Sequence, residues 1–230
     1  QDQPPRPARR VGENTLVRLD ILSDPICPWC YLGKVRLDRA LEARPDHPFA
    51  VEWHPFQLNP DMPPEGMDRR AYLEAKFGGK EGAVQAYLPL VEHAAASGVA
   101  LNLDRIARTP NTLDAHRLIH WAGLEGRQGA MVAALFRAYF REGRDIGDAG
   151  VLAALAGEAG LDPAVVARLL AGDADRALVA ERDAHARARG VSAVPTFILA
   201  DTYVISGAQT PETWIRIIDE LIEKEKATSA

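Results

Sequence analysis

Cysteine is the scarcest residue in this sequence: 230 residues contain only two, Cys27 and Cys30. Two cysteines cannot build the multi-bridge framework of a small secreted domain. A chain of this length with 47% hydrophobic residues can bury a sizeable core without such bridges. A bond between Cys27 and Cys30 would also close a very short loop, and disulfide stabilisation grows with the length of the closed loop. A role as a structural staple is therefore disfavoured.

Concentrated positive charge and long hydrophobic runs are also missing. The formal net charge is −5, and Arg6, Arg9 and Arg10 form the main basic cluster. Nucleic-acid binding is not indicated, because phosphate contacts require a dense Lys/Arg surface. The uncharged segment VSAVPTFILA (191–200) is about as long as the apolar runs become, well short of the roughly 18 residues that a membrane span requires. We expect no nucleic-acid partner and no membrane span.

The N-terminal segment QDQPPRPARRVGE lacks the apolar stretch of an intact secretory signal. Its prolines and arginines predict a disordered tail over residues 1–13. The sequence begins with Gln1 and not with Met, so removal of a segment before this numbering stays open. Because no further cysteines are available as structural bridges, we expect a cytoplasmic protein.

A strand, a helix and a second strand begin the regular part of the chain. In TLVRLDILS (15–23), three apolar residues alternate with a mixed set that includes Arg18 and Asp20, which predicts a sheet strand. Helical spacing follows over residues 28–44, and FAVEWHPFQL (49–58) again predicts a strand. This order is typical of a βαβ unit with a right-handed crossover.

The middle of the chain predicts helices and almost no strands. The expected helical stretches are 68–78, 81–97, 112–125, 128–142, 148–159, 162–171 and 174–189. Asn111 is a candidate helix cap, and Pro163 suits the first position of a helix. Pro89 should kink or split the helix that contains it.

Strand signals return near the C-terminus. Two runs, 196–199 and 202–205, flank a turn at Ala200–Asp201 and predict a hairpin, and an amphipathic helix begins near Pro211. The sequence therefore predicts an α/β fold in which a helical domain divides a small α/β domain. The expected limits are residues 14–62 and 188–227 for the two halves of the α/β domain, and residues 63–187 for the inserted all-α domain.

Both cysteines lie in the motif CPWC, at the junction of the first strand and the first helix. Pro28 suits the first helical position and moves Cys27 out of helical geometry, so we expect Cys27 at the N-cap and Cys30 one turn inside. Free backbone N–H groups and the positive end of the helix dipole favour a thiolate there. We therefore expect a depressed pKa for Cys27, which makes it the nucleophile, and a less exposed resolving thiol at Cys30.

The cysteine pair has two other interpretations. Free cysteines often act as small buried hydrophobic residues, but a CxxC pair within a βαβ unit is typical of a redox site. A zinc site would need two more ligands, and no second pair stands at C-x2-C spacing. We predict a redox pair and no metal.

Four stretches resemble the DsbA family of thioredoxin-fold oxidoreductases: SDPICPWCYLGK (23–34), WHPFQLNPDMPPEG (53–66), NTLDAHRL (111–118) and GVSAVPTFIL (190–199). The closer similarity is to the FrnE-like branch, which is related to the 2-hydroxychromene-2-carboxylate isomerases. The resemblance implies a thioredoxin-like fold with a large all-α insertion domain. It also implies that the partners are protein thiols or disulfides, or glutathione as a co-substrate, and that no other cofactor is needed.

The resemblance further implies a cis peptide bond between Val194 and Pro195, opposite the CPWC loop. The backbone of Val194 could then pair with an extended substrate segment and hold it against Cys27. A proline that simply begins a strand is the plainer alternative for Pro195. Packing is the alternative to a substrate contact for Trp29. The candidate substrate-binding residues are Pro28, Trp29, Asn111, His116, Val194 and Pro195.

Two departures from the family bear on the chemistry. DsbA-type oxidants typically carry a histidine between the cysteines, and Trp29 in that position predicts a weaker oxidant. The 2-hydroxychromene-2-carboxylate isomerases generally have a serine where Cys27 stands and use it to activate glutathione. Two cysteines favour dithiol chemistry over that reaction.

Several polar residues have less specific interpretations. His116 and His120 have the i, i+4 spacing of a metal-binding helix face, but structural or surface histidines are more common. A carboxylate at Asp20 or Asp24 could relay a proton to the buried thiol. The alternatives are a solvent-exposed position for Asp20 and a turn position for Asp24. Arg36 is interpreted as part of the solvated side of the first helix.

The sequence predicts a thiol–disulfide oxidoreductase or isomerase in which Cys27 attacks a protein disulfide and Cys30 resolves the mixed disulfide. An enzymatic alternative is a glutathione-dependent isomerase or transferase that acts on a small aromatic or polyketide-like molecule. A non-enzymatic alternative is a chaperone-like module that binds unfolded chains.

Overall fold

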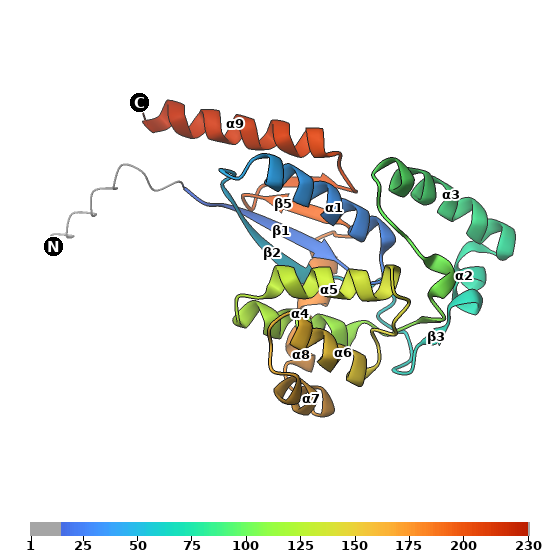
Figure 1. Ribbon diagram of the computed structural model, residues 1–230. Helices are drawn as coiled ribbons and strands as arrows, with labels where there is room; N and C mark the ends of the chain where they lie inside the picture. Colours follow the sequence, from blue (N-terminus) through green and yellow to red (C-terminus); the bar gives the residue numbers. More distant parts are fainter. Residues whose placement is uncertain (1–14, 230) are drawn as a thin grey trace.

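The computed structural model describes residues 15–229, so the tail predicted at residues 1–13 lies outside the described part of the chain. A four-stranded sheet with the order β2-β1-β5-β6 forms the centre of the molecule (Figure 1). Its strands are β1 (Val17–Ser23), β2 (Phe49–Pro55), β5 (Thr196–Leu199) and β6 (Tyr203–Ser206). β1 and β2 are parallel and are joined by α1 (Pro28–Ala43), whereas β5 is antiparallel to both β1 and β6. The predicted βαβ unit and C-terminal hairpin are confirmed.

The two faces of the sheet differ in polarity because side chains alternate along each strand. On one face, Leu19 and Ile21 are fully buried in the main hydrophobic core. Helix α9 (Pro211–Ser229) covers this face, with the ring of Trp214 edge-on to Phe197 at a centroid distance of 4.8 Å. The opposite face carries Arg18 and Asp20 and lies toward α8 (Arg176–Ala188). The mixed polarity predicted for the first strand is therefore confirmed.

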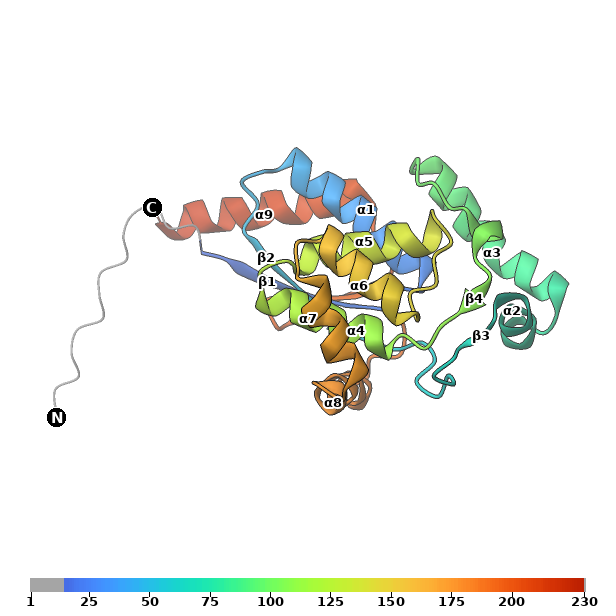
Figure 2. The ribbon, with the colours of Figure 1, turned by 60° about the horizontal axis from the view of Figure 1, so that its bottom comes forward.

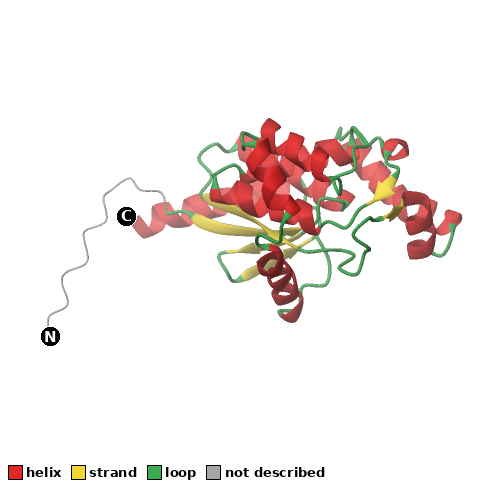
Figure 3. Ribbon diagram, turned by 90° about the horizontal axis from the view of Figure 1, so that it is seen from below, coloured by secondary structure: helices red, strands yellow, loops and turns green. Residues whose placement is uncertain are grey.

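The segment between β2 and β5 is almost entirely helical. Its elements are β3 (Met67–Asp68), α2 (Arg69–Phe77), α3 (Lys80–Ala96), a 3-10 turn (Leu103–Arg105), β4 (Arg108–Thr109), α4 (Leu113–Leu124), α5 (Gln128–Phe140), α6 (Ala149–Glu158), α7 (Pro163–Ala171) and α8. Every predicted helical stretch is present. The short β3–β4 pair stands apart from the main sheet and was not predicted, because two residues show no alternation (Figure 3). The domain limits given above stay a prediction.

The inserted helices share the hydrophobic core of the sheet. Tyr31 of α1 stacks on Phe136 and Phe140 of α5 at centroid distances of 5.3 and 5.6 Å. Helices α2 and α3, joined at Gly78–Gly79, lie together at one end of the molecule in two views (Figures 1 and 2). No helix among residues 15–229 combines the length and the apolar character needed to cross a bilayer.

Arg117 of α4 is a fully buried cation inside the insert. Its guanidinium donates to the carbonyl oxygens of Leu169, Gly172 and Ala174 at 2.8–2.9 Å, and to the carboxylate of Asp114 at 2.9 Å. These carbonyls lie at or just after the end of α7, where the helix leaves its last acceptors without partners. Arg117 therefore fixes the end of α7 to α4.

The helix ends follow most of the local signals. Pro163 begins α7 as predicted, behind the capping carboxylate of Asp162. The prediction of Asn111 as a cap was wrong by one residue: Thr112 is the N-cap of α4, although the Asn111 side chain accepts from the backbone N–H of Leu113 at 2.9 Å. Pro89 does not split α3, because it lies on the exposed side, where water can satisfy the carbonyl that loses its donor.

Candidate redox site

Cys27 is the N-cap residue of α1, with φ and ψ angles of −86° and 112°. Its backbone N–H donates to the carbonyl oxygen of Asp24 at 2.9 Å, and its Sγ accepts from the backbone N–H of Cys30 at 3.3 Å. Pro28 occupies the first turn, where its missing N–H costs nothing. The sulfur therefore lies at the positive end of α1, the position that favours a thiolate. The predicted N-cap geometry is confirmed.

Cys30 lies one turn further along α1 and deeper in the core. Its exposed fraction is 1%, against 4% for Cys27, and both are free thiols. Burial raises the pKa of Cys30 well above its usual value, and the neighbouring sulfur of Cys27 raises it further. Burial therefore favours the protonated form of Cys30, and Cys27 is the less buried thiol of the pair.

A loop from the far end of the chain completes the site. The peptide bond between Val194 and Pro195 is cis, as the family resemblance implies. The carbonyl oxygen of Val194 lies 3.7 Å from the Sγ of Cys27. On α1, a Cβ added to Gly33 would stand 3.3 Å from the Cγ of Pro195. The glycine at position 33 therefore allows the loop that contains Pro195 to lie close against α1.

A buried carboxylate and imidazole lie behind the CPWC loop. The side chains of Asp24 and His116 are 0% and 2% exposed, and the Nε2 of His116 lies 3.2 Å from the Oδ1 of Asp24. The other oxygen of Asp24 accepts from the backbone N–H of Leu58 at 2.8 Å. Asp24 therefore ties the cysteine loop both to the segment after β2 and to α4 of the insert.

The two histidines of α4 do not form a common ligand site. The Nε2 of His116 lies 3.2 Å from a carboxylate oxygen of Asp24, whereas the Nε2 of His120 lies 3.8 Å from a carboxylate oxygen of Asp175. His116 is also buried and lies behind the loop, so it is not open to a ligand beside Cys27. The metal interpretation of the i, i+4 spacing has no support in this geometry.

Two other predicted substrate contacts, Trp29 and Asn111, interact with neighbouring parts of the fold. Trp29 is half-buried, and its ring is edge-on to His93 of α3 at a centroid distance of 5.6 Å. The side-chain amide of Asn111 donates to the carbonyl oxygen of Met62 at 2.7 Å, and its oxygen lies 3.3 Å from the Nε2 of Gln57. Both side chains therefore hold elements together next to the redox pair.

One interpretation of the sequence placed Asp20 in solvent, and the structure shows that this was wrong. Asp20 is buried on the sheet face opposite α1, where it accepts from Arg18 at 2.9 Å and from His54 at 2.6 Å. Asp20, His54 and Glu52 bring three potential metal ligands within 4.8 Å of one another. The Oδ1 of Asp20 already accepts from both Arg18 and His54, so these side chains form a hydrogen-bonded network.

The environment of Arg36 was also predicted wrongly. Arg36 is buried, and it donates to the Oγ of Ser97 at 3.1 Å and to the carbonyl oxygen of Ala208 at 3.2 Å. Burial lowers its pKa, and the nearby Arg39 lowers it further. Because Ser97 and Ala208 lie far along the chain, no local pattern could have predicted that Arg36 joins α1 to α3 and to the loop before α9.

Comparison with known proteins identifies related chains. A family model described as a DSBA-like thioredoxin domain matches residues 18–218. The YwbO protein of Bacillus subtilis (strain 168) is 29% identical over 211 residues, which cover 91% of this chain and 99% of YwbO. The crystal structure of a probable DsbA oxidoreductase from Streptomyces coelicolor has 34% identity, covers 90% of each chain and gives a TM-score of 0.79.

Two more distant structures share the fold. The cytosolic disulfide reductase DsbM from Pseudomonas aeruginosa, solved with GSH, is 23% identical, with a TM-score of 0.65 and coverage of 90% of this chain and 99% of DsbM. A 2-hydroxychromene-2-carboxylate isomerase is 18% identical, with a TM-score of 0.70 and coverage of 93% and 100%. The family match spans the cysteine pair, the inserted helices and the loop at Pro195. This chain therefore belongs to the DsbA-like thioredoxin family, with a thioredoxin-like sheet that is divided by a helical insertion.

Proposed function

We propose that this protein is a thiol–disulfide oxidoreductase that acts on protein disulfides through Cys27 and Cys30. The observation that carries the proposal is the asymmetry of the pair. Cys27 caps α1 with its sulfur beside the carbonyl oxygen of Val194, while Cys30 is buried behind it with a raised pKa. This is the arrangement that an attacking thiolate and a resolving thiol require.

The reaction proceeds by two thiol–disulfide exchanges. The Cys27 thiolate attacks one sulfur of the substrate disulfide, so that a mixed disulfide forms and the second substrate sulfur leaves as a thiolate. Cys30 then gives up its proton and attacks Cys27, which releases the first substrate thiol and leaves a Cys27–Cys30 disulfide. Two electrons pass from the protein to the substrate, and the reverse sequence oxidises substrate thiols. With Cys27 alone cycling, the same chemistry rearranges disulfides.

Substrate is held by the backbone at Val194 in this proposal. A polypeptide that lies in extended form along the loop before β5 can pair with the Val194 backbone and bring its sulfur to Cys27. Pro28 and Trp29 follow Cys27 in the chain, and Pro195 follows Val194 across the cis bond. The side chains of Asn111 and His116 support the site from behind.

The test is reduction of insulin disulfides by dithiothreitol, followed by turbidity. Wild-type protein should accelerate the reaction, and Cys27→Ser should abolish the acceleration. Cys30→Ser should accumulate a mixed disulfide that mass spectrometry detects, because no resolving thiol remains. Wild-type rates in Cys27→Ser would reject the proposal. Equilibration with glutathione buffers should give a potential more negative than the about −120 mV of DsbA, since Trp29 replaces the histidine that stabilises a DsbA thiolate.

The second candidate is a glutathione-dependent isomerase or transferase acting on a small aromatic or polyketide-like molecule. It is favoured by the likeness to an isomerase structure and to a DsbM structure that was solved with GSH. In this case Cys27 binds glutathione, and activity survives Cys30→Ser. If no Cys27–Cys30 disulfide forms and Cys27 only takes up glutathione, this candidate replaces the first.

We place the protein in the FrnE-like branch and in the cytoplasm as part of the same proposal. The sequence supports both placements through the stretches quoted above and through its two cysteines, which leave no other residues for structural disulfides. The likeness to DsbM, named as a cytosolic disulfide reductase, supports the second placement. Fractionation of the source cells with an antibody against the native protein tests it.

A further inference from the structure

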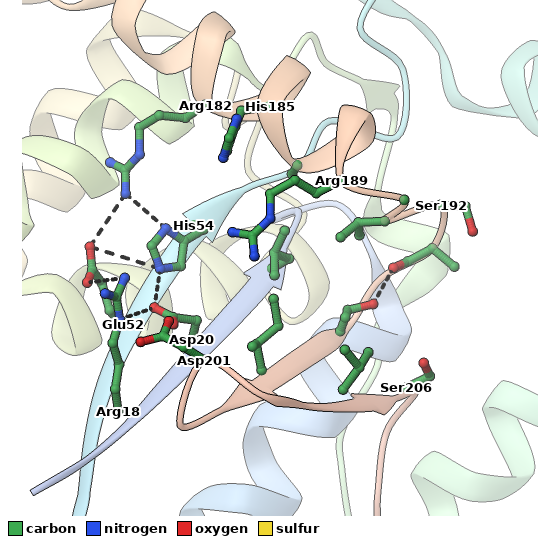
Figure 4. Close-up of a pocket in the computed structure, with 18 of the residues that line it drawn as sticks. Arg18, Asp20, Glu52, His54, Arg182, His185, Arg189, Ser192, Asp201 and Ser206 are labelled. Atoms are coloured by element: carbon green, nitrogen blue, oxygen red, sulfur yellow. Dashed lines mark hydrogen bonds and ion pairs between the residues drawn. The ribbon is translucent and has the colours of Figure 1, made fainter.

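A cavity of about 880 Å³ lies between α8 and the sheet face opposite α1 (Figure 4). Its floor comes from all four strands of the sheet, its roof from α8, and one rim from residues 190–193. This volume is within the range of roughly 300–1,000 Å³ that is typical of sites for small organic molecules. Neither cysteine lines the cavity, so the redox pair does not account for it.

The face that α8 turns toward the sheet is unusual in composition. A helix that covers a sheet normally presents apolar residues there. The residues of α8 and its C-cap that line the cavity include the basic Arg182, His185 and Arg189. Leu178, Glu181 and Ala186 line it as well. Figure 4 shows the three basic side chains on the side of the helix that faces the strands. The cavity exists because these long polar side chains occupy positions where apolar side chains would otherwise pack against the sheet.

One end of the cavity is closed by a charge-balanced network. The Nη2 of Arg182 donates to the Nδ1 of His54 at 2.9 Å, so that nitrogen must be an acceptor and the proton must sit on Nε2. The Nε2 donates to Asp20 at 2.6 Å, which also accepts from Arg18. Glu52 lies 3.5 Å from Arg182 and 3.6 Å from Arg18. Both arginines are therefore matched by carboxylates, and this end offers no charge for a ligand.

The positive charge of Arg189 is not matched in this way. Among residues 15–229, neither Arg189 nor His185 has an ion-pair partner within 4 Å. Two exposed acids, Glu181 and Asp201, also line the cavity. Neither lies within 4 Å of Arg189, and Asp201 acts on Arg18 at the closed end. Figure 4 shows the guanidinium of Arg189 projecting from α8 into the space above the strands.

An apolar strip runs along the rest of the cavity. It is made of side chains from the sheet, from α8 and from the loop before β5: Leu22, Ala186, Val191, Ile198 and Val204. An apolar ligand that covers this strip removes apolar surface from water, which favours binding. A guanidinium beside it adds a charge-assisted hydrogen bond to a carboxylate or sulfonate.

We propose that this cavity binds a small organic anion with an apolar body, of the class of aromatic or medium-chain carboxylates and sulfonates. The anionic group lies at Arg189 and His185, and the apolar body covers the strip. The site uses neither cysteine, so it stands or falls separately from the proposed redox function.

The test uses two fluorescent probes of similar shape on the full-length protein. The anionic probe is 8-anilinonaphthalene-1-sulfonate, and the uncharged probe is N-phenyl-1-naphthylamine. We expect Arg189→Gln to raise the Kd of the sulfonate about tenfold, because one charge-assisted hydrogen bond is lost. The Kd of the neutral probe should change less than twofold, because that probe carries no charge. Arg168→Gln removes an exposed arginine from α7 and is the matched control, which should leave both constants unchanged.

Two further measurements locate the bound probe. Octanoate should displace the sulfonate, whereas octan-1-ol, which has the same tail and no charge, should be at least tenfold weaker. Alkylation of Cys27 should leave the affinity within twofold. The proposal would be overturned if the folded wild type did not bind the sulfonate, or if Arg189→Gln and Arg168→Gln weakened sulfonate binding equally. It would also be overturned if octan-1-ol displaced the sulfonate as well as octanoate does, or if alkylation of Cys27 abolished sulfonate binding. Arg189→Gln should have the circular dichroism spectrum and melting temperature of the wild type, which would show that a lower affinity does not reflect unfolding.

Discussion

Removal of the His116 imidazole should leave the buried carboxylate of Asp24 without its side-chain partner. The side chain of Asp24 is 0% exposed, and it has the imidazole at 3.2 Å and the N–H of Leu58 at 2.8 Å as its partners. In His116→Leu only the Leu58 N–H remains, and a buried charge that loses its partner costs about 3–5 kcal/mol of unfolding free energy. In the double variant Asp24→Asn, His116→Leu the charge is also gone. We therefore expect the double variant to be less destabilised than the sum of the two single variants, by about 2 kcal/mol.

The assay is urea unfolding of the reduced protein at pH 7, followed by circular dichroism, for the wild type and the three variants. His120→Leu is the control, because His120 lies one turn further along α4, is 16% exposed and stands 3.8 Å from its nearest acid, Asp175. It should cost less than about 1 kcal/mol. A cost for His116→Leu no larger than that of the control, or a coupling below about 0.5 kcal/mol, would refute a tie between the cysteine loop and the insert.

Three more predictions follow from two buried polar groups, Cys30 and Arg117. Because burial raises the pKa of Cys30, iodoacetamide at pH 7 should label Cys27 and spare Cys30 in peptide mass spectra, and equal labelling would contradict this. The same shift predicts that the reduced protein melts at lower temperature as the pH rises past about 9, since the unfolded chain then releases a proton that the folded chain retains. Arg117→Met should cost about 3 kcal/mol or more in urea unfolding, because the carbonyls of Gly172 and Ala174 lose the guanidinium donor. The carbonyl of Leu169 loses it too and keeps only the backbone N–H of Gly172. Arg176→Met, which removes an exposed partner of Asp114, should cost less than about 1 kcal/mol.

The features of the fold that the sequence predicted well depend on neighbours in the chain. Pro28 determines both where α1 begins and that Cys27 precedes it, so the N-cap could be inferred from two residues. The start of α7 at Pro163 follows in the same way. The cis bond before Pro195 has no such local signal, and it was expected from the family resemblance alone.

The features that the sequence did not predict join segments far apart. Asp20 was a candidate for a solvent-exposed position, yet it is buried, because His54 of the adjacent strand donates to it. Arg36 was interpreted as solvated, yet its partners Ser97 and Ala208 come from α3 and the loop before α9. Alternation along a strand indicates which side chains share a face. It does not indicate that α8 will cover that face with arginines and leave a cavity beneath them.

The placement of the insert also determines when the redox site can exist during synthesis. The ribosome releases β1, Cys27, Cys30 and β2 first, and β1 and β2 are the parallel neighbours in the sheet. The strand that flanks β1 on its other side, β5, follows only after all the inserted helices, and with it comes the carbonyl of Val194. A nascent or truncated chain that ends within the insert therefore carries both thiols without the carbonyl of Val194 that lies beside Cys27 in the complete fold. Only the last sixth or so of the sequence brings that carbonyl to the cysteine pair.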